Sequence, residues 1–191
     1  MRLIKLISIS ICLCFVSCSR LAKHVKMDVI NISEFNFDSY LGYNLKDSNA
    51  IYSLLGLGFF QTPKSIDADS LIKIWIDKHP RSVVLPVCTI NASGKNRVVN
   101  KNLIYCWIVD KSDTINVFLI RNGCFPASTL QRPKTWEEMS REEKSLYPVE
   151  EKPDITVHID KEVYKTFLKQ IYSAEKYAKE NKLGIWNDSI R

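Results

Sequence analysis

Apolar positions near the end of the chain repeat with the period of an α-helix. After Asp160, which can cap a helix, apolar residues recur at steps of four, four, three and four, with mostly polar residues between them. This stripe consists of Val163, Phe167, Ile171, Ala174 and Ala178. The pattern predicts a long amphipathic helix that ends at residues 183–186, where Gly184 is a stop signal and Trp186 is expected to dock on the core.

Earlier in the chain, apolar residues form continuous runs. The runs over 83–90 and 103–109 are rich in β-branched and aromatic residues and flank a polar turn at 91–95, so they predict two buried strands. Pro86 indicates an edge or a bulge in the first strand, because proline has no backbone N–H to donate. Residues 51–60 are also apolar, and their two glycines indicate a bend near the end of a strand.

Two short helices are predicted around these strands. The first covers 71–77 and follows Asp67 and Asp69, either of which can serve as an N-cap. The second covers 116–120, follows two candidate caps, and is expected to end at Gly123 in a left-handed conformation.

Residues 126–158 interrupt this alternation of strands and helices. Prolines surround Thr135-Trp136-Glu137-Glu138, in which the threonine and the second glutamate have the spacing of a capping box. The sequence therefore predicts a short acidic helix in a surface insertion ahead of the C-terminal helix.

The first 17 residues have the pattern of a secretory signal peptide. Arg2 and Lys5 precede an uncharged, mostly apolar stretch over 6–16. This stretch is shorter than the about 20 residues that a spanning helix needs, so a permanent transmembrane anchor is the weaker interpretation. Removing residues 1–17 would lower the formal net charge from +6 to +4. We divide the remainder into a polar tether over 18–36 and a domain over 37–191.

The end of the leader indicates how the protein is held in place. Val16-Ser17-Cys18 resembles the bacterial lipobox, in which a small residue precedes a cysteine that receives a diacylglycerol. The resemblance implies that Cys18 is lipidated, that its lipid inserts into a membrane, and that the protein is anchored in the bacterial cell envelope on its periplasmic or surface face. The alternative is a plain signal peptide with Cys18 as an ordinary thiol.

Composition and cysteine content limit the remaining possibilities. The 191-residue chain is 46% hydrophobic and 25% charged, which excludes a disordered protein. Beyond Cys18 it contains Cys88, Cys106 and Cys124, an odd number without the spacing of a zinc site. A hairpin that turns at 91–96 would place Cys88 opposite about residue 99, so we expect no disulfide with Cys106 and interpret all three as mostly buried thiols.

Two segments of the chain resemble the thermonuclease family, whose best-known member is staphylococcal nuclease. The segment 116–123 is similar to that family's Asn-x-x-Leu-Val-Arg-x-Gly helix. The segment 174–186 resembles its terminal Glu-x-x-Ala-x-x-x-x-Leu-Gly-Ile-Trp helix and matches the glutamate at Glu175. The order of elements from 65 to 123 also agrees with the second half of the family domain.

The resemblance implies a fold and one structural contact. The fold is α+β and β-rich: a five-stranded OB-type barrel with about three helices, here with the acidic helical insertion before the C-terminal helix. In the family, the arginine of the first helix and the glutamate of the terminal helix form a buried ion pair, which corresponds to Arg121 and Glu175 in this chain. Loss of either partner of a buried pair costs about 3 to 5 kcal/mol.

The residues that catalyse phosphodiester hydrolysis in the family are largely replaced. The family uses carboxylates for one Ca²⁺, a glutamate that activates water and two arginines that stabilise phosphate charge. Here Gln61-Thr62-Pro63-Lys64 retains only threonine and proline of the family's Asp-Thr-Pro-Glu. Gly56 and Asn102 stand where the two arginines are expected. These positions describe a vestigial site with little anionic charge, which we expect to bind Ca²⁺ poorly.

We therefore assign no catalytic residue and no metal ligand, and expect a lipid-anchored protein with a binding or structural role toward a protein or glycan. One alternative is a divergent Ca²⁺-dependent nuclease for DNA or RNA that recruits other carboxylates, namely Asp38, Asp47, Asp67 or Asp69. A second is a nucleic-acid binder without hydrolysis, although the chain has no run of basic residues. The three histidines are isolated along the chain.

Overall fold

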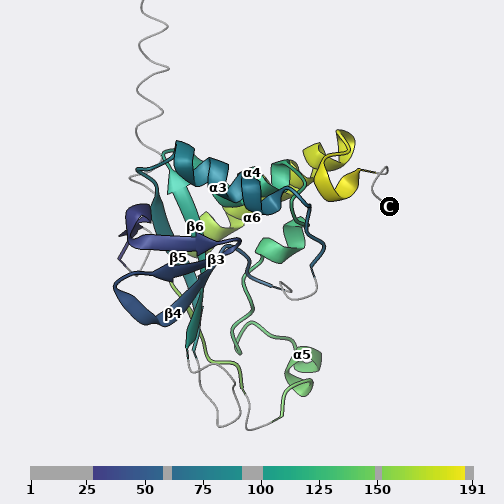
Figure 1. Cartoon of the computed structure of the whole chain (residues 1–191). Coiled ribbons are helices and arrows are strands. Elements are labelled where there is room, and N and C mark those ends of the chain that lie inside the picture. The colour runs from purple at the N-terminus through teal and green to yellow at the C-terminus, as the bar shows by residue number, and fades with distance from the viewer. Residues whose placement is uncertain (1–27, 58–61, 92–100, 149–151, 188–191) are drawn as a thin grey trace, which may run out of the picture.

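The structure is a computed structural model that describes residues 28–57, 62–91, 101–148 and 152–187 (Figure 1). It has an α+β, β-rich architecture: a curled half-barrel sheet with a path of six strands, joined by four α-helices of which the C-terminal one is long. No helix in these ranges is both long enough and apolar enough to span a bilayer.

The sheet path runs in the order β1-β5-β6-β4-β3-β2. In chain order these strands are β1 (Ile30–Asn31), β2 (Phe35–Asp38), β3 (Leu41–Asn44), β4 (Asp47–Ser53), β5 (Val83–Ile90) and β6 (Asn102–Asp110). Strands β4 and β6 are parallel, and the other pairs of the path are antiparallel. Because only a 3₁₀ turn over Ile32–Glu34 separates β1 from β2, the two ends of the path are consecutive in the chain.

Strands β5 and β6 confirm the hairpin that the apolar runs predict. Leu85 faces Trp107 across the pair, and the register shifts between Pro86 and Cys88, so the proline marks a bulge. It does not mark an edge, because β1 and the short strand β8 (Ile155–Val157) pair with the other side of β5.

The hairpin register differs from our expectation for the cysteines. Cys88 is paired with Tyr105 rather than with a residue near 99, because the last pair of the hairpin is Ile90 with Leu103, so the connection between the strands is longer than the expected turn at 91–96. Cys88, Cys106 and Cys124 are all buried and form no disulfide. Burial raises the pKa of Cys88 and Cys124 to about 12 and raises that of Cys106 as well. The expectation of buried thiols is thus confirmed.

The helices surround the sheet where the patterns place them. Helix α3 (Ala68–Lys78) buries Ile72 and Trp75, but the side chain of Asp67 makes no capping hydrogen bond. Helix α4 (Ile115–Arg121) follows a two-residue strand, β7 (Asp113–Thr114), and the Thr114 side chain caps it by accepting from the Val117 backbone N–H. At the end of α4, Gly123 has φ +66°, as predicted.

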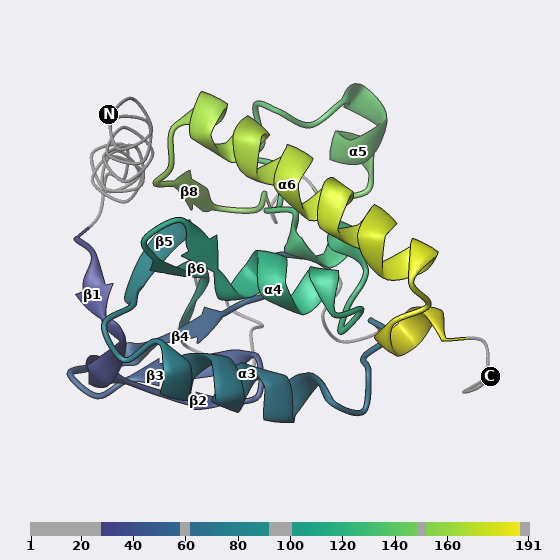
Figure 2. The same cartoon turned by 90° about the horizontal axis from the view of Figure 1, so that it is seen from above.

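The long helix α6 (Lys161–Glu180) packs through the predicted stripe and lies alongside α4 (Figure 2). The Asp160 carboxylate caps it by accepting from the backbone N–H groups of Glu162 and Val163. Phe167 stacks on Trp107 of β6, with ring centroids 4.0 Å apart. The Ile185 N–H donates to the Gly123 carbonyl at 2.9 Å, which fastens the segment after α6 to the end of α4.

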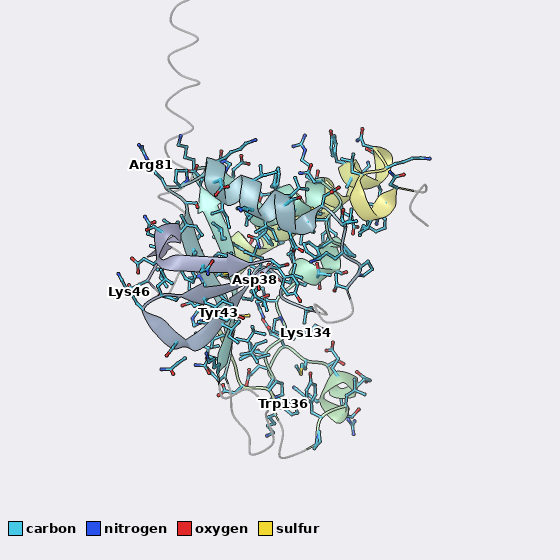
Figure 3. All side chains as sticks on the ribbon, viewed as in Figure 1. Asp38, Tyr43, Lys46, Arg81, Lys134 and Trp136 are labelled. Atoms are coloured by element: carbon cyan, nitrogen blue, oxygen red, sulfur yellow. The ribbon has the colours of Figure 1, made fainter. Side chains whose placement is uncertain are left out.

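The insertion is present, but its helix begins later than predicted. Residues 135–139 form turns in which the Thr135 N–H donates to the Glu138 carboxylate, and α5 (Arg141–Ser145) follows with a complete capping box between Ser140 and Glu143. Lys134 and Trp136 lie on this insertion, at the opposite end of the molecule from Arg81 (Figure 3).

The folded part of the chain also begins earlier than predicted. The segment over 30–36, which we placed in the tether, contains β1 and the start of β2. Ile32 is only 5% exposed, and Phe35 contacts Tyr52 edge to face. Its apolar residues are too few and too irregularly spaced to reveal a strand by periodicity.

Candidate functional site

The predicted vestigial positions that the structure describes make different local contacts. Gly56 follows β4, and its N–H donates to the Thr129 carbonyl at 2.7 Å. A Cβ atom at this position would collide with the Gln131 carbonyl, so Gly56 permits a close backbone contact. Gln61 lies outside the described residues, and Thr62 is half-buried in the segment before α3.

Lys64 contacts the first turn of α3. Its Nζ lies 2.6 Å from the Asp69 carboxylate and 3.5 Å from the Ser39 hydroxyl, and that hydroxyl also donates to Asp69. Partial burial acts to raise the pKa of Asp69, but the hydrogen bonds from Lys64 and Ser39, with the lysine charge, hold it below its ordinary value. The carboxylate that Lys64 contacts, which follows the threonine-proline segment, is therefore neutralised by a cation of the same chain.

Asn102 lies elsewhere, in a polar hollow of about 270 Å³ between β4, β5, β6 and β8. Asp47 lines the same hollow, as do Thr89 and His158, whose side chains share a hydrogen bond of 2.7 Å. Asp38 instead lines a different hollow, between β2 and α3. Within the ranges that the structure describes, no group of three or more His, Cys, Asp or Glu side chains is placed to hold a metal ion.

The expected ion pair between Arg121 and Glu175 is replaced by other contacts. Glu175 accepts a hydrogen bond of 2.9 Å from the Ala127 N–H and forms an ion pair of 2.8 Å with Lys179, one helical turn further along α6. The Arg121 guanidinium lies over the Tyr177 ring, 4.6 Å from its centroid. Arg121 is exposed at the end of α4 and contacts α6 at Tyr177 instead of at Glu175.

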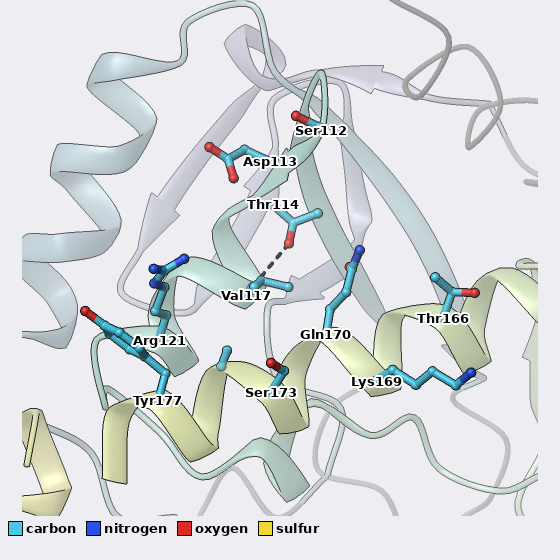
Figure 4. Close-up of a pocket in the computed structure, with 11 residues that line it drawn as sticks. Ser112, Asp113, Thr114, Val117, Arg121, Thr166, Lys169, Gln170, Ser173 and Tyr177 are labelled. Atoms are coloured by element: carbon cyan, nitrogen blue, oxygen red, sulfur yellow. Dashed lines mark hydrogen bonds between the residues drawn. The ribbon is translucent and has the colours of Figure 1, made fainter. Parts of the chain in front are cut away.

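This arrangement places Arg121 at a groove between α4 and α6 (Figure 4). The groove has a volume of about 520 Å³. Val117 and Ala174 provide its apolar surface, and polar side chains from the β6–α4 connection and from α6 form its walls. The lining residues of the second group are Ser112, Asp113, Thr114, Thr166, Lys169, Gln170, Ser173 and Tyr177.

The groove is lined by two cationic side chains that form no ion pair with the described residues. Among the ion pairs of the described residues, none involves Arg121, Lys169 or Asp113. The lining therefore carries two positive charges and one negative charge. An arginine with five N–H donors beside hydroxyl and amide groups is suited to hold a carboxylate or phosphate oxygen.

Our sequence reasoning named Arg121 but missed the groove around it. Thr166, Gln170, Ser173 and Tyr177 stand at steps of four, three and four, a polar stripe beside the apolar stripe that we used. Such a stripe is normally the solvated face of a helix, and only the position of α4 shows that it forms one wall of a groove.

Comparison with known proteins gives no relative: no protein-family model matches the chain, and no curated protein matches it.

Proposed function

We propose that this protein is a lipid-anchored protein of the bacterial cell envelope whose thermonuclease-like domain binds a ligand and does not hydrolyse phosphodiesters. The thermonuclease-like fold is supported by the sheet path. If β1 and β2 are counted as two halves of one bent strand, the five strands follow one another in the order 1-2-3-5-4-1, with the third strand parallel to the last, and α3 connects the third to the fourth. An OB-type barrel has this connectivity.

The Lys64–Asp69 ion pair is the observation that carries the proposed loss of hydrolysis. A Ca²⁺ ion needs several oxygen ligands with net negative charge. At the threonine-proline turn, the Asp69 carboxylate is bound by a lysine and a hydroxyl instead. A cation at that position would have to displace the lysine.

A binding role is supported by the groove between α4 and α6. Its uncompensated arginine and lysine, with hydroxyl and amide groups between them, provide directed donors for a polar ligand. The proposed attachment to the membrane is supported by the sequence of the leader, in which Cys18 follows Val16 and Ser17. Cys18 lies outside the described residues.

A nuclease assay tests the catalytic part of this proposal. The purified chain is incubated with single-stranded DNA and with RNA, with Ca²⁺ and with chelator, and the products are separated by size. We expect no cleavage in any condition. Cleavage that chelator abolishes, and that Asp69→Asn or Asp38→Asn removes, would establish the divergent nuclease instead.

The same samples distinguish the non-hydrolytic nucleic-acid binder. Binding of an oligonucleotide that weakens steeply with salt would favour that function, because counterion release sets the slope. Membrane attachment is tested separately by fractionating cells that express wild type or Cys18→Ala. We expect the substitution to move the protein from the membrane to the soluble fraction, and an unchanged distribution would contradict lipidation at Cys18.

A further inference from the structure

We infer that the groove between α4 and α6 binds an acidic saccharide, with Arg121 holding a carboxylate or other oxyanion of the sugar. This inference rests on the proposed binding role and specifies its ligand class. It is carried by the contacts of Arg121, the length of the groove and the polar side chains of its walls.

Arg121 is held in place while its donors stay available. The guanidinium lies 4.6 Å from the centroid of the Tyr177 ring, and the described residues supply no hydrogen bond or ion pair to it. Stacking on an aromatic face restricts the side chain without using its in-plane N–H groups. A ligand oxyanion can therefore accept two parallel hydrogen bonds with little further ordering of the side chain. Tyr177 itself is 41% exposed, so the end of the groove is open to a ligand.

The groove is elongated rather than deep. Its α6 wall runs from Thr166 to Tyr177, which at 1.5 Å per residue corresponds to about 16 Å. In Figure 4, Gln170 and Ser173 stand along this wall between Arg121 and Lys169. A ligand of three or four sugar units has this length, and the intervening amide and hydroxyl groups can bond to its hydroxyls.

The walls favour a saccharide over a peptide. Both helices satisfy their own backbone groups, so an extended peptide cannot add to the site as a strand. No large aliphatic side chain is among the lining residues, whose apolar members are Val117, Ala174 and the ring of Tyr177, so the groove offers little for the large apolar anchors of a helical peptide. Side-chain hydroxyls and amides are the donors and acceptors that remain, and they suit a polyhydroxylated ligand.

The charge of the groove favours a ligand with few anionic groups. Asp113 stands on the opposite wall from α6 in the same groove as Arg121 (Figure 4). A nucleic-acid backbone carries one charge on every nucleotide and would bring further phosphates toward this carboxylate. The exposed ring of Tyr177 could stack a base, but the Arg121 guanidinium covers one of its faces.

The test is isothermal titration calorimetry on the full-length chain in a non-glycosidic detergent. The probes are two hexasaccharides, one with a single uronic acid unit and one with a single sulfate group, with uncharged maltohexaose as the control of equal length. We expect at least one acidic probe to bind, maltohexaose to bind at least about tenfold more weakly, and Arg121→Gln to weaken the acidic probe by about tenfold or more.

Two further variants make the result specific to the groove. Arg81→Gln removes an exposed arginine outside the groove and should leave the affinity unchanged. Ser173→Tyr places a ring in the groove and should abolish binding. Thermal unfolding of each variant confirms that it is folded, since both Arg121 and Ser173 are exposed.

Several outcomes would overturn the inference. These are the absence of binding by both acidic probes, equal binding of maltohexaose, an equal loss with Arg81→Gln, or an octamer of thymidylate that competes for the groove with higher affinity. The nuclease assay distinguishes a wrong assignment of the ligand from a wrong proposed function. Cleavage of DNA would refute the non-hydrolytic role, whereas absent saccharide binding without cleavage would refute only the assignment of the ligand.

Discussion

Two glycines let separate turns of the chain meet backbone to backbone. Gly123 ends α4 with φ +66°, and Gly184 follows α6 with φ +52°. A Cβ atom on either residue would collide with backbone of the opposite turn. We expect Gly184→Ala to lower the free energy of unfolding by about 2 kcal/mol or more, because it adds both strain at positive φ and overlap. Urea unfolding of the variant measures this loss.

Lys182 supplies a control of opposite sign in the same turn. It also has positive φ, at 52°, but it carries a side chain that this conformation disfavours. Lys182→Gly should leave the free energy of unfolding unchanged or raise it by up to about 1 kcal/mol. If Gly184→Ala unfolded at the same urea concentration as wild type, the close backbone contact between the two glycines would not exist in solution.

Asn116 is fully buried and connects three segments through its side-chain amide. Its Nδ2 donates to the carbonyls of Leu54 and Cys106, and its Oδ1 accepts from the Ile108 N–H at 3.2 Å. Asn116→Leu keeps a similar volume but leaves three buried backbone groups without this partner. We expect a loss of about 3 kcal/mol or more in the free energy of unfolding, since each such group costs about 1 to 3 kcal/mol. A loss below 1 kcal/mol would show that water or a shifted backbone replaces the amide.

At the scale of elements, Glu175 joins α6 to the segment after α4 by accepting from the Ala127 N–H, in place of the expected ion pair with Arg121. Glu175→Ala removes the acceptor of the Ala127 N–H and an ion pair with a partly exposed lysine. We expect a loss of about 1 to 2 kcal/mol, below the 3 to 5 kcal/mol typical of a broken buried pair. A double-mutant cycle with Arg121→Ala should give a coupling energy near zero, and a coupling above about 1 kcal/mol would restore the original pairing.

Strand β1 and its following turn are a second element that a single substitution tests. Ile32 is 5% exposed at the junction of β1 and β2, whereas Leu45, in the turn between β3 and β4, is 71% exposed. We expect Ile32→Ala to cost about 2 to 4 kcal/mol, and Leu45→Ala to cost less than about 0.5 kcal/mol. If residues 28–36 were a tether, both substitutions would leave the melting temperature unchanged.

The elements predictable from the sequence are those with strong local patterns. The stripe of α6, the apolar runs of β5 and β6 and the positive φ of Gly123 each depend on residues close together in the chain. The site could not be predicted in the same way. Among the described residues, Arg121 pairs with neither its expected partner nor another carboxylate, because the direction of an exposed arginine depends on Tyr177 of another helix.

At the scale of the whole molecule, one arginine of the insertion contacts both the turn around Glu138 and the long helix α6. Arg132 forms two hydrogen bonds with Glu138, at 2.7 and 2.6 Å. Its guanidinium lies 5.1 Å from the ring centroid of Tyr164 on α6, and the Tyr164 hydroxyl accepts from the Arg132 backbone N–H. The side chain of Arg132 is mostly buried against the body, while Glu138 is 42% exposed. The carboxylate is thus the part of this contact that solvent acidity can reach.

Acid should therefore weaken the attachment of the insertion. The hydrogen bonds from Arg132 lower the pKa of Glu138 from an ordinary value of 4.5 to about 2. Because the folded pKa is the lower one, the contribution is fully present above about pH 5 and is lost as the pH falls toward 2. We expect the melting temperature of wild type to exceed that of Glu138→Gln at pH 7 and the difference to vanish near pH 2. Measuring both proteins from pH 2 to 7 tests this, with Glu137→Gln as the control, since Glu137 is an exposed neighbouring carboxylate that forms no ion pair with the described residues. A difference that stays constant over this range would mean that the charge of Glu138 does not hold the insertion in place.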